Sequence, residues 1–127
     1  MLLGGFNLRL SSENLMKQLD TTYIDAHLKD LSYDHLSHTV IMKYGEYKNV
    51  DSDCTVIFKD CFSVNINTWL EGMKGTVPQK PGERDFFFHD IEIEDIEING
   101  INLYKCSMVI PMMDCQITCV NIEIKST

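Results

Sequence analysis

Apolar and polar residues alternate on both sides of Asn99-Gly100, between residues 91 and 110. Asn-Gly favours a type I′ turn, because both central residues of that turn need a positive φ, and the pattern therefore predicts a β-hairpin. A two-residue turn also fixes the register of the two strands. The expected pairs are Ile98 with Ile101, Ile96 with Leu103, Glu94 with Lys105, Ile93 with Cys106 and Ile91 with Met108. In this register the apolar face changes sides halfway along both strands. The tip of the hairpin should therefore pack against something other than the main core.

Shorter periodic segments predict further strands and one helix. Ser11 can cap a short helix with an apolar stripe. Residues 23–33 alternate as a strand, with a phase slip between Leu28 and Leu31 that indicates a bulge. The other expected elements are strands at 39–47, 54–58 and 115–125, the last with a phase slip after Cys119, turns at 34–38 and 48–53, and a loop at 72–82.

One segment fits two patterns. Phe62, Val64 and Ile66 alternate as in a strand, yet Phe62, Ile66 and Trp69 also have helical spacing. The β-branched residues favour a strand as far as Ile66. The expected fold is therefore mainly β (all-β or α+β), an antiparallel meander or sandwich with a short N-terminal helix, formed by residues 1–127 as a single domain.

Composition and charge narrow the classes of function. The chain has 127 residues, 44% of them hydrophobic and 24% charged, as in an ordinary soluble globular protein. A net charge of −8 with only 11 basic residues speaks against binding to nucleic acid, and it favours a cationic partner or simply solubility. No run reaches the about 18 apolar residues of a membrane span, and the N-terminus lacks the basic region of a secretory signal. We therefore expect a cytoplasmic protein with no membrane partner. Its five cysteines should then be reduced, mostly as core thiols.

The candidate catalytic and metal-binding residues are scattered. His35 and His38 are three residues apart, but they fall in a predicted turn, where this spacing does not bring two ligands to one helix face. Cys115 and Cys119 are four apart in a predicted strand, which makes a poor chelate. No catalytic signature surrounds any thiol. We expect no catalytic, cofactor-binding or metal-binding residues.

A group of carboxylates on the first strand of the hairpin is the remaining candidate site. Its members are Asp90, Glu92 and Glu94 on one side of the strand, and Asp95 and Glu97 on the other. They can form a solvated face that discourages aggregation at a sheet edge. Alternatively, they can form a docking surface for a basic partner, because like charges this close are costly unless something uses them.

The order of elements resembles a known group of proteins. A short helix is followed by residues 23–34, YIDAHLKDLSYD, a second strand, residues 56–61, VIFKDC, and a terminal hairpin. This arrangement is similar to the YxiG-like group of bacterial immunity proteins, which are encoded beside secreted polymorphic toxins. The resemblance implies a protein that is not an enzyme and that binds a cognate toxin domain in the cytosol. It carries over no binding residues, so the acidic residues or the 72–82 loop could make the contact.

Two other readings stay open. A small ligand-binding or weakly enzymatic β-sandwich could use His27 or His89 with a thiol or carboxylate in a pocket. A homo-oligomer would follow if the aromatic run at 86–88 were exposed. The oligomeric state is not predicted.

Overall fold

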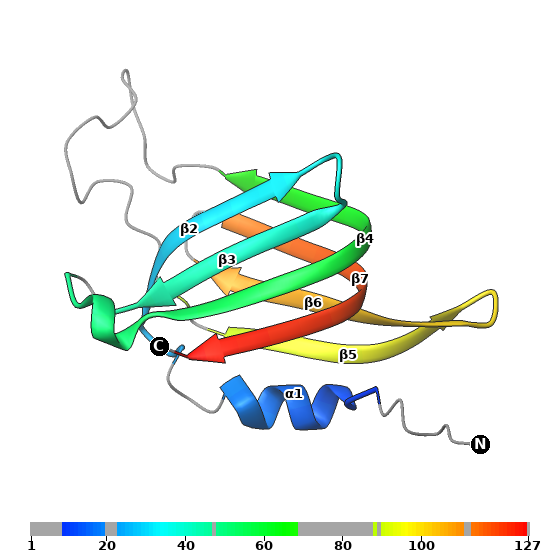
Figure 1. Ribbon diagram of the computed structural model, residues 1–127, viewed down its shortest axis with the longest axis horizontal. Helices are drawn as coiled ribbons and strands as arrows, with labels where there is room; N and C mark the ends of the chain where they lie inside the picture. The colour runs from blue at the N-terminus through cyan, green and yellow to red at the C-terminus, as the bar shows by residue number, and fades with distance from the viewer. Residues whose placement is uncertain are drawn as a thin grey trace.

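The computed structural model describes residues 9–19, 23–46, 48–68, 88, 90–110 and 113–126. These residues form one antiparallel sheet of six strands with a short helix beside it (Figure 1). The elements are α1 Ser12–Leu19, β2 His27–Asp34, β3 Thr39–Gly45, the 3₁₀ turn η1 Val50–Ser52, β4 Cys54–Thr68, β5 Asp90–Ile98, β6 Ile101–Ile110 and β7 Met113–Ser126. The predicted mainly β fold with a short N-terminal helix is confirmed.

Two three-stranded meanders meet at the centre of the sheet. The strand order is β2-β3-β4-β7-β6-β5, so the long strands β4 and β7 join the meanders. The first half of β4 lies between β3 and β7, and β6 pairs with the first half of β7. Figure 1 shows β4 and β7 bending sharply, so that the sheet curves round on itself. A single curved sheet therefore provides the two layers that a sandwich builds from separate sheets.

A bulge in β4 accompanies this bend. Cys61 pairs with Cys119 but Ser63 pairs with Thr118, which makes Phe62 an extra residue in β4. A bulge of this kind bends its strand and strengthens the local twist. The strand predicted as far as Ile66 is confirmed. However, Phe62 is 66% exposed. As the extra residue of the bulge, it does not follow the alternation of side chains along the rest of β4.

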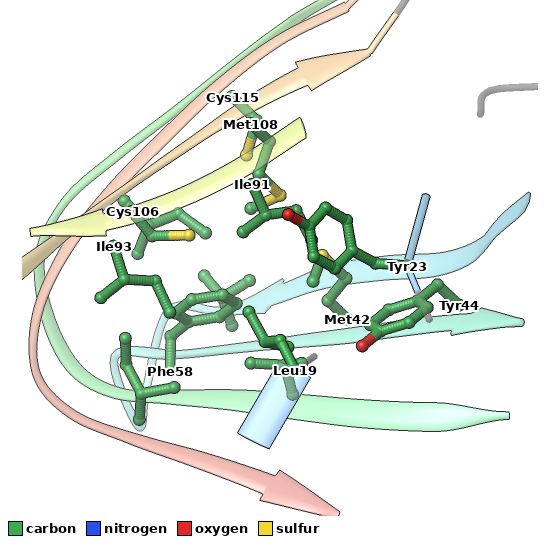
Figure 2. Packing of buried hydrophobic residues seen from close by; sticks show 14 of the residues in the cluster. Leu19, Tyr23, Met42, Tyr44, Phe58, Ile91, Ile93, Cys106, Met108 and Cys115 are labelled. Atoms are coloured by element: carbon green, nitrogen blue, oxygen red, sulfur yellow. The ribbon is translucent and has the colours of Figure 1, made fainter. Parts of the chain in front are cut away.

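The core lies on the inner, concave face of the curved sheet and is completed by α1. Leu15 and Leu19 of α1 are fully buried, and the helix packs against β5 and β7. Figure 2 shows side chains from both halves of the sheet meeting between the layers, with Phe58 and Ile93 among them. All five cysteines are buried free thiols, in agreement with the prediction of core thiols. Burial of apolar side chains is the main way in which this core stabilises the fold.

The register predicted for the hairpin is confirmed at every pair. Ile98 lies opposite Ile101 and each of the four more distant pairs follows. Asn99 and Gly100 have φ angles of 52° and 81°, as a type I′ turn requires. The predicted bulge in the first strand is also present, because the register of β2 shifts between Leu28 and Asp30.

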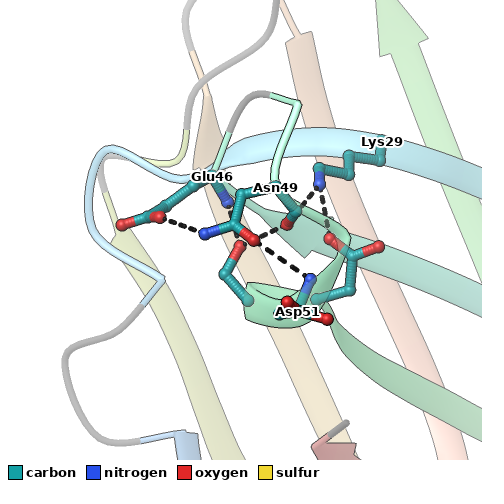
Figure 3. A network of polar contacts seen from close by, with 6 residues as sticks. Lys29, Glu46, Asn49 and Asp51 are labelled. Carbon is teal, nitrogen blue, oxygen red and sulfur yellow. Dashed lines mark hydrogen bonds and ion pairs between the residues drawn. The ribbon is translucent and has the colours of Figure 1, made fainter.

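The bulge in β2 positions Lys29 over the loop that follows β3. Its ammonium group forms an ion pair with the buried carboxylate of Asp53 and donates to the Asn49 carbonyl at 3.2 Å. The Asn49 amide in turn donates to Glu46 at 2.9 Å, and Figure 3 shows these contacts as one network. Gly45 permits the Asp53 side chain to lie close to the β3 backbone, since a Cβ at position 45 would lie 2.6 Å from the Asp53 carboxylate.

Several predictions fall outside the described residues. These are the 72–82 loop, Trp69, His89 and two members of the 86–88 aromatic run. The third, Phe88, is fully buried and forms an edge contact with Tyr44, with ring centroids 5.4 Å apart. Among the described helical residues, no segment has the length and apolar character needed to cross a membrane.

Candidate partner-binding face

The strand registers place polar residues in rows across the outer, convex side of the sheet. Glu92 of β5 lies opposite Ser107 of β6, which lies opposite Gln116 of β7, which lies opposite Asn65 of β4. Side chains alternate between the two sides of a strand, and most residues of the neighbouring rows are buried in the core, so this row faces outward. The row on one side is Asp90, Val109, Asp114 and Asn67, and the row on the other is Glu94, Lys105, Thr118 and Ser63. We call these three rows the outer polar face.

A shallow hollow lies on the outer polar face, next to the acidic strand. It has a volume of about 350 Å³ and is lined by residues of β4, β6 and β7, among them the polar residues Asn65, Asn67, Asp114 and Gln116. The Asn67 amide donates to the Asn65 side-chain oxygen at 2.8 Å. The hollow therefore offers amide and carboxylate groups that can pair with the donors of a ligand or partner.

The three predicted carboxylates of this face differ in how far they are engaged. Asp90 accepts a hydrogen bond of 3.4 Å from the Tyr23 hydroxyl, and burial together with this carboxylate raises the pKa of Tyr23. Glu92 and Glu94 are exposed. Lys105 is the Cα partner of Glu94, as predicted, but the ion pairs among the described residues do not include this pair. Glu92 and Glu94 are therefore the carboxylates most available to another molecule.

Asp95 has a structural role on the inner side of the same strand. Its carboxylate accepts from the Ser12 amide at 2.9 Å and from the Arg9 guanidinium at 3.0 Å, at the N-terminus of α1. These contacts, the amide first, hold the pKa of Asp95 below its usual value. Arg9 also lies 3.6 Å from the ring centroid of Tyr104, whose hydroxyl donates to the Leu10 carbonyl. Asp95 thus ties the N-terminal segment to the sheet, and its carboxylate is engaged within the protein.

Glu97 also lies apart from the outer polar face. It is two residues beyond Asp95 on the same side of β5, and it is exposed near the hairpin tip. The structure thus divides the predicted acidic group into an outer set, Asp90, Glu92 and Glu94, and an inner set, Asp95 and Glu97. This division agrees with the two sides predicted from the sequence.

The apolar face of the hairpin changes sides as its register predicts. Ile91 and Ile93 are buried in the core, whereas Ile98 and Ile101 at the tip are each 49% exposed on the outer side. Phe62 from the β4 bulge is the neighbour that they meet across a groove. The pattern of the hairpin predicted a packing partner at its tip, but no local feature of the sequence pointed to Phe62, because its position depends on the bulge.

Among the described residues, His35 and His38 lie in an exposed turn and the cysteine candidates lie in the core. The rings of His35 and His38 lie edge to face in the β2–β3 turn, with centroids 6.1 Å apart. Burial raises the pKa of Cys115 to about 11, and it also raises the pKa of Cys106, so both thiols stay protonated at neutral pH and are poor nucleophiles. Within the described ranges, no cluster of three or more metal-ligating side chains is present.

The fold and its surface define a small, acidic, mainly β protein with rows of polar residues across the outer face of a curved sheet. The family model of the immunity protein PIM7 matches residues 11–126, and the chain belongs to this family of immunity proteins. The class implied by the sequence resemblance is therefore confirmed, although the match does not point to the YxiG-like group in particular. No curated protein matches the chain.

Proposed function

We propose that this chain neutralises a cognate toxin domain by binding it in the cytoplasm through the outer polar face. It would act by binding the toxin domain and blocking its activity, and not by catalysis. Membership of an immunity-protein family is the observation that carries this proposal. The acidic edge and the adjoining hollow support the choice of surface.

The charge of the face favours a basic toxin surface. The three rows carry four carboxylates, Asp90, Glu92, Glu94 and Asp114, against one lysine, Lys105. Opposite charges on two proteins speed their encounter and suppress wrong partners. In a toxin that binds phosphate, such as a nuclease, the carboxylates can take the places of phosphate groups. The partner expected is therefore a toxin domain with lysines and arginines around its active site.

Charge reversal on the two sides of β5 tests the proposal. The probe is the C-terminal domain of the toxin encoded beside the gene for this chain, prepared as a catalytically inactive variant. Glu92→Lys combined with Glu94→Lys should weaken binding by about tenfold or more and flatten its dependence on salt. Glu92→Lys and Glu94→Lys are also measured singly, and Glu97→Lys is their matched control, because it makes the same single charge reversal on the same strand but on the inner side.

The measurement is titration calorimetry at two salt concentrations, with circular dichroism to verify that each variant is folded. A folded double variant that binds as tightly as the unchanged protein would remove the outer polar face from the account. Failure of the unchanged protein to bind the toxin domain would contradict the proposed function itself.

A further inference from the structure

An exposed apolar groove lies at the tip of the β5–β6 hairpin. It has a volume of about 230 Å³ and is lined by Phe62, Ile98, Asn99, Ile101 and Leu103. Phe62 is 66% exposed, and Ile98 and Ile101 are each 49% exposed. A single ordered water needs only about 10–15 Å³ of such space, so the groove has room for a much larger group.

The groove is separate from the hydrophobic core. Leu103 is buried, with 3% of its surface exposed, yet it does not belong to the core cluster on the concave side of the sheet. It forms the floor of the groove, and Phe62 and the two tip isoleucines are the more exposed residues around it. The hairpin tip extends beyond the curved body of the sheet in Figure 1, and Ile98 and Ile101 at this tip are exposed.

The groove continues the outer polar face. Toward the hairpin tip, the next outward-facing residue after Glu94 on β5 is Ile96, and the one next to Lys105 on β6 is Leu103. Phe62 precedes Ser63, which ends the same row. One surface therefore carries carboxylates at one end and an apolar groove at the other, and a single partner can contact both.

We propose that the groove receives an apolar side chain of the toxin domain, next to the basic residues that pair with Glu92 and Glu94. This inference rests on the proposed function and specifies the partner: a toxin surface with an apolar anchor flanked by lysine or arginine. Side chains that fill a desolvated pocket near the centre of an interface commonly dominate its affinity.

Charge favours this occupant over a second copy of the chain. Two copies that met through this surface would bring together two faces that each carry four carboxylates and one lysine, in a protein with a net charge of −8. Like charges held together across an interface oppose association. A basic partner gains from the same carboxylates that a second copy must overcome.

Polar substitution at the groove tests the inference with the same inactive toxin domain. Phe62→Ser and Ile101→Ser should each weaken binding by about tenfold or more, because the apolar anchor loses its contacts. The salt dependence of binding should stay as in the unchanged protein, since no charge is altered. Leu36→Ser is the matched control: Leu36 is 90% exposed in the β2–β3 turn, and its loss should leave the affinity unchanged.

The outcomes separate this inference from the proposed function. If the unchanged protein binds the toxin and folded Phe62→Ser and Ile101→Ser bind equally well, the groove is not the anchor site, while the proposed function stands. If the unchanged protein does not bind, the proposed function fails first. Sedimentation of the protein alone gives the third test. If the unchanged protein is a dimer and Phe62→Ser makes it a monomer, the groove binds a second copy of the chain and not the toxin. We expect a monomer for both proteins.

Discussion

Asp95 and Glu94 are adjacent in the chain, but their surroundings differ. Glu94 is exposed on the outer side of β5, whereas Asp95 binds the N-terminus of α1 and the Arg9 guanidinium on the inner side. A carboxylate at a helix N-terminus is stabilised by the free amides and by the helix dipole. One acidic stretch thus contains a structural carboxylate beside carboxylates that are open to a partner.

Substitution of Asp95 tests this role. Asp95→Asn should lower the free energy of unfolding by about 1 kcal/mol at neutral pH, because the charge at the helix N-terminus is lost. The pKa of Asp95 is lowered in the folded protein, so its stabilising effect is fully present above the ordinary value of 3.8 and is lost as the pH falls through the lowered value.

Urea unfolding of both proteins across the acid range gives the measurement. The difference between them should be constant near neutral pH and shrink below about pH 4, where the carboxylate of the unfolded chain becomes protonated. Glu97→Gln, on the same side of β5, is the control and should change stability little. An Asp95→Asn protein as stable as the original at pH 7 would refute the capping role.

The alternation of residues along the strand could not show that Asp95 has a different role from the neighbouring carboxylates. Alternation predicted that Asp95 and Glu97 lie on the side opposite Glu92, which the register confirms. The helix partner of Asp95 depends on a contact over 83 residues of chain. No local feature of the sequence pointed to this partner, because the contact joins the first turn of α1 to a strand far along the chain.

At the level of elements, the β2 bulge shows how one extra residue redirects a side chain. Lys29 is the residue at which the register between β2 and β3 shifts, and its side chain reaches the buried carboxylate of Asp53. The ion pair joins β2 to the start of β4, with side chains only 20% and 10% exposed. The bulge therefore anchors β2, an edge strand of the sheet, to the loop beside η1.

Removal of this cation should be costly. Lys29→Met should lower the free energy of unfolding by about 2 kcal/mol, less than the roughly 3–5 kcal/mol seen when a fully buried pair loses one partner. Lys43→Met, at an exposed position of the neighbouring strand, should change stability by less than about 0.5 kcal/mol. Equal stabilities of the two variants in chemical denaturation would contradict this role for Lys29.

Local signals predicted the elements well, because they act over a few residues. Asn99-Gly100 fixed the β5–β6 register, and the phase slip after Leu28 located the β2 bulge. The pairing of β4 with β7 is different, since it joins residues that are 45 to 72 positions apart and follows from the packing of the whole sheet. The outward position of Phe62 depends on that pairing, so the sequence predicted a partner for the hairpin tip without identifying it.

At the level of the whole molecule, curvature gives the two sides of the sheet different tasks. The sheet curves round on itself (Figure 1), and its concave side and α1 enclose the core. The convex side carries the outer polar face and the apolar groove beside it. The outer polar face and the groove therefore lie on the side of the sheet away from the core residues that stabilise the fold. This separation predicts that variants of the convex side lose binding and keep their stability.

Protection of living cells tests the central claim most directly. Bacterial cells that express the active toxin domain encoded beside this gene are grown with the unchanged protein or with the Glu92→Lys, Glu94→Lys variant, at matched levels of folded protein. We predict that the unchanged protein restores growth and that the double variant needs a higher expression level for the same protection. Cells that die despite abundant folded, unchanged protein would contradict the proposed neutralisation of the toxin.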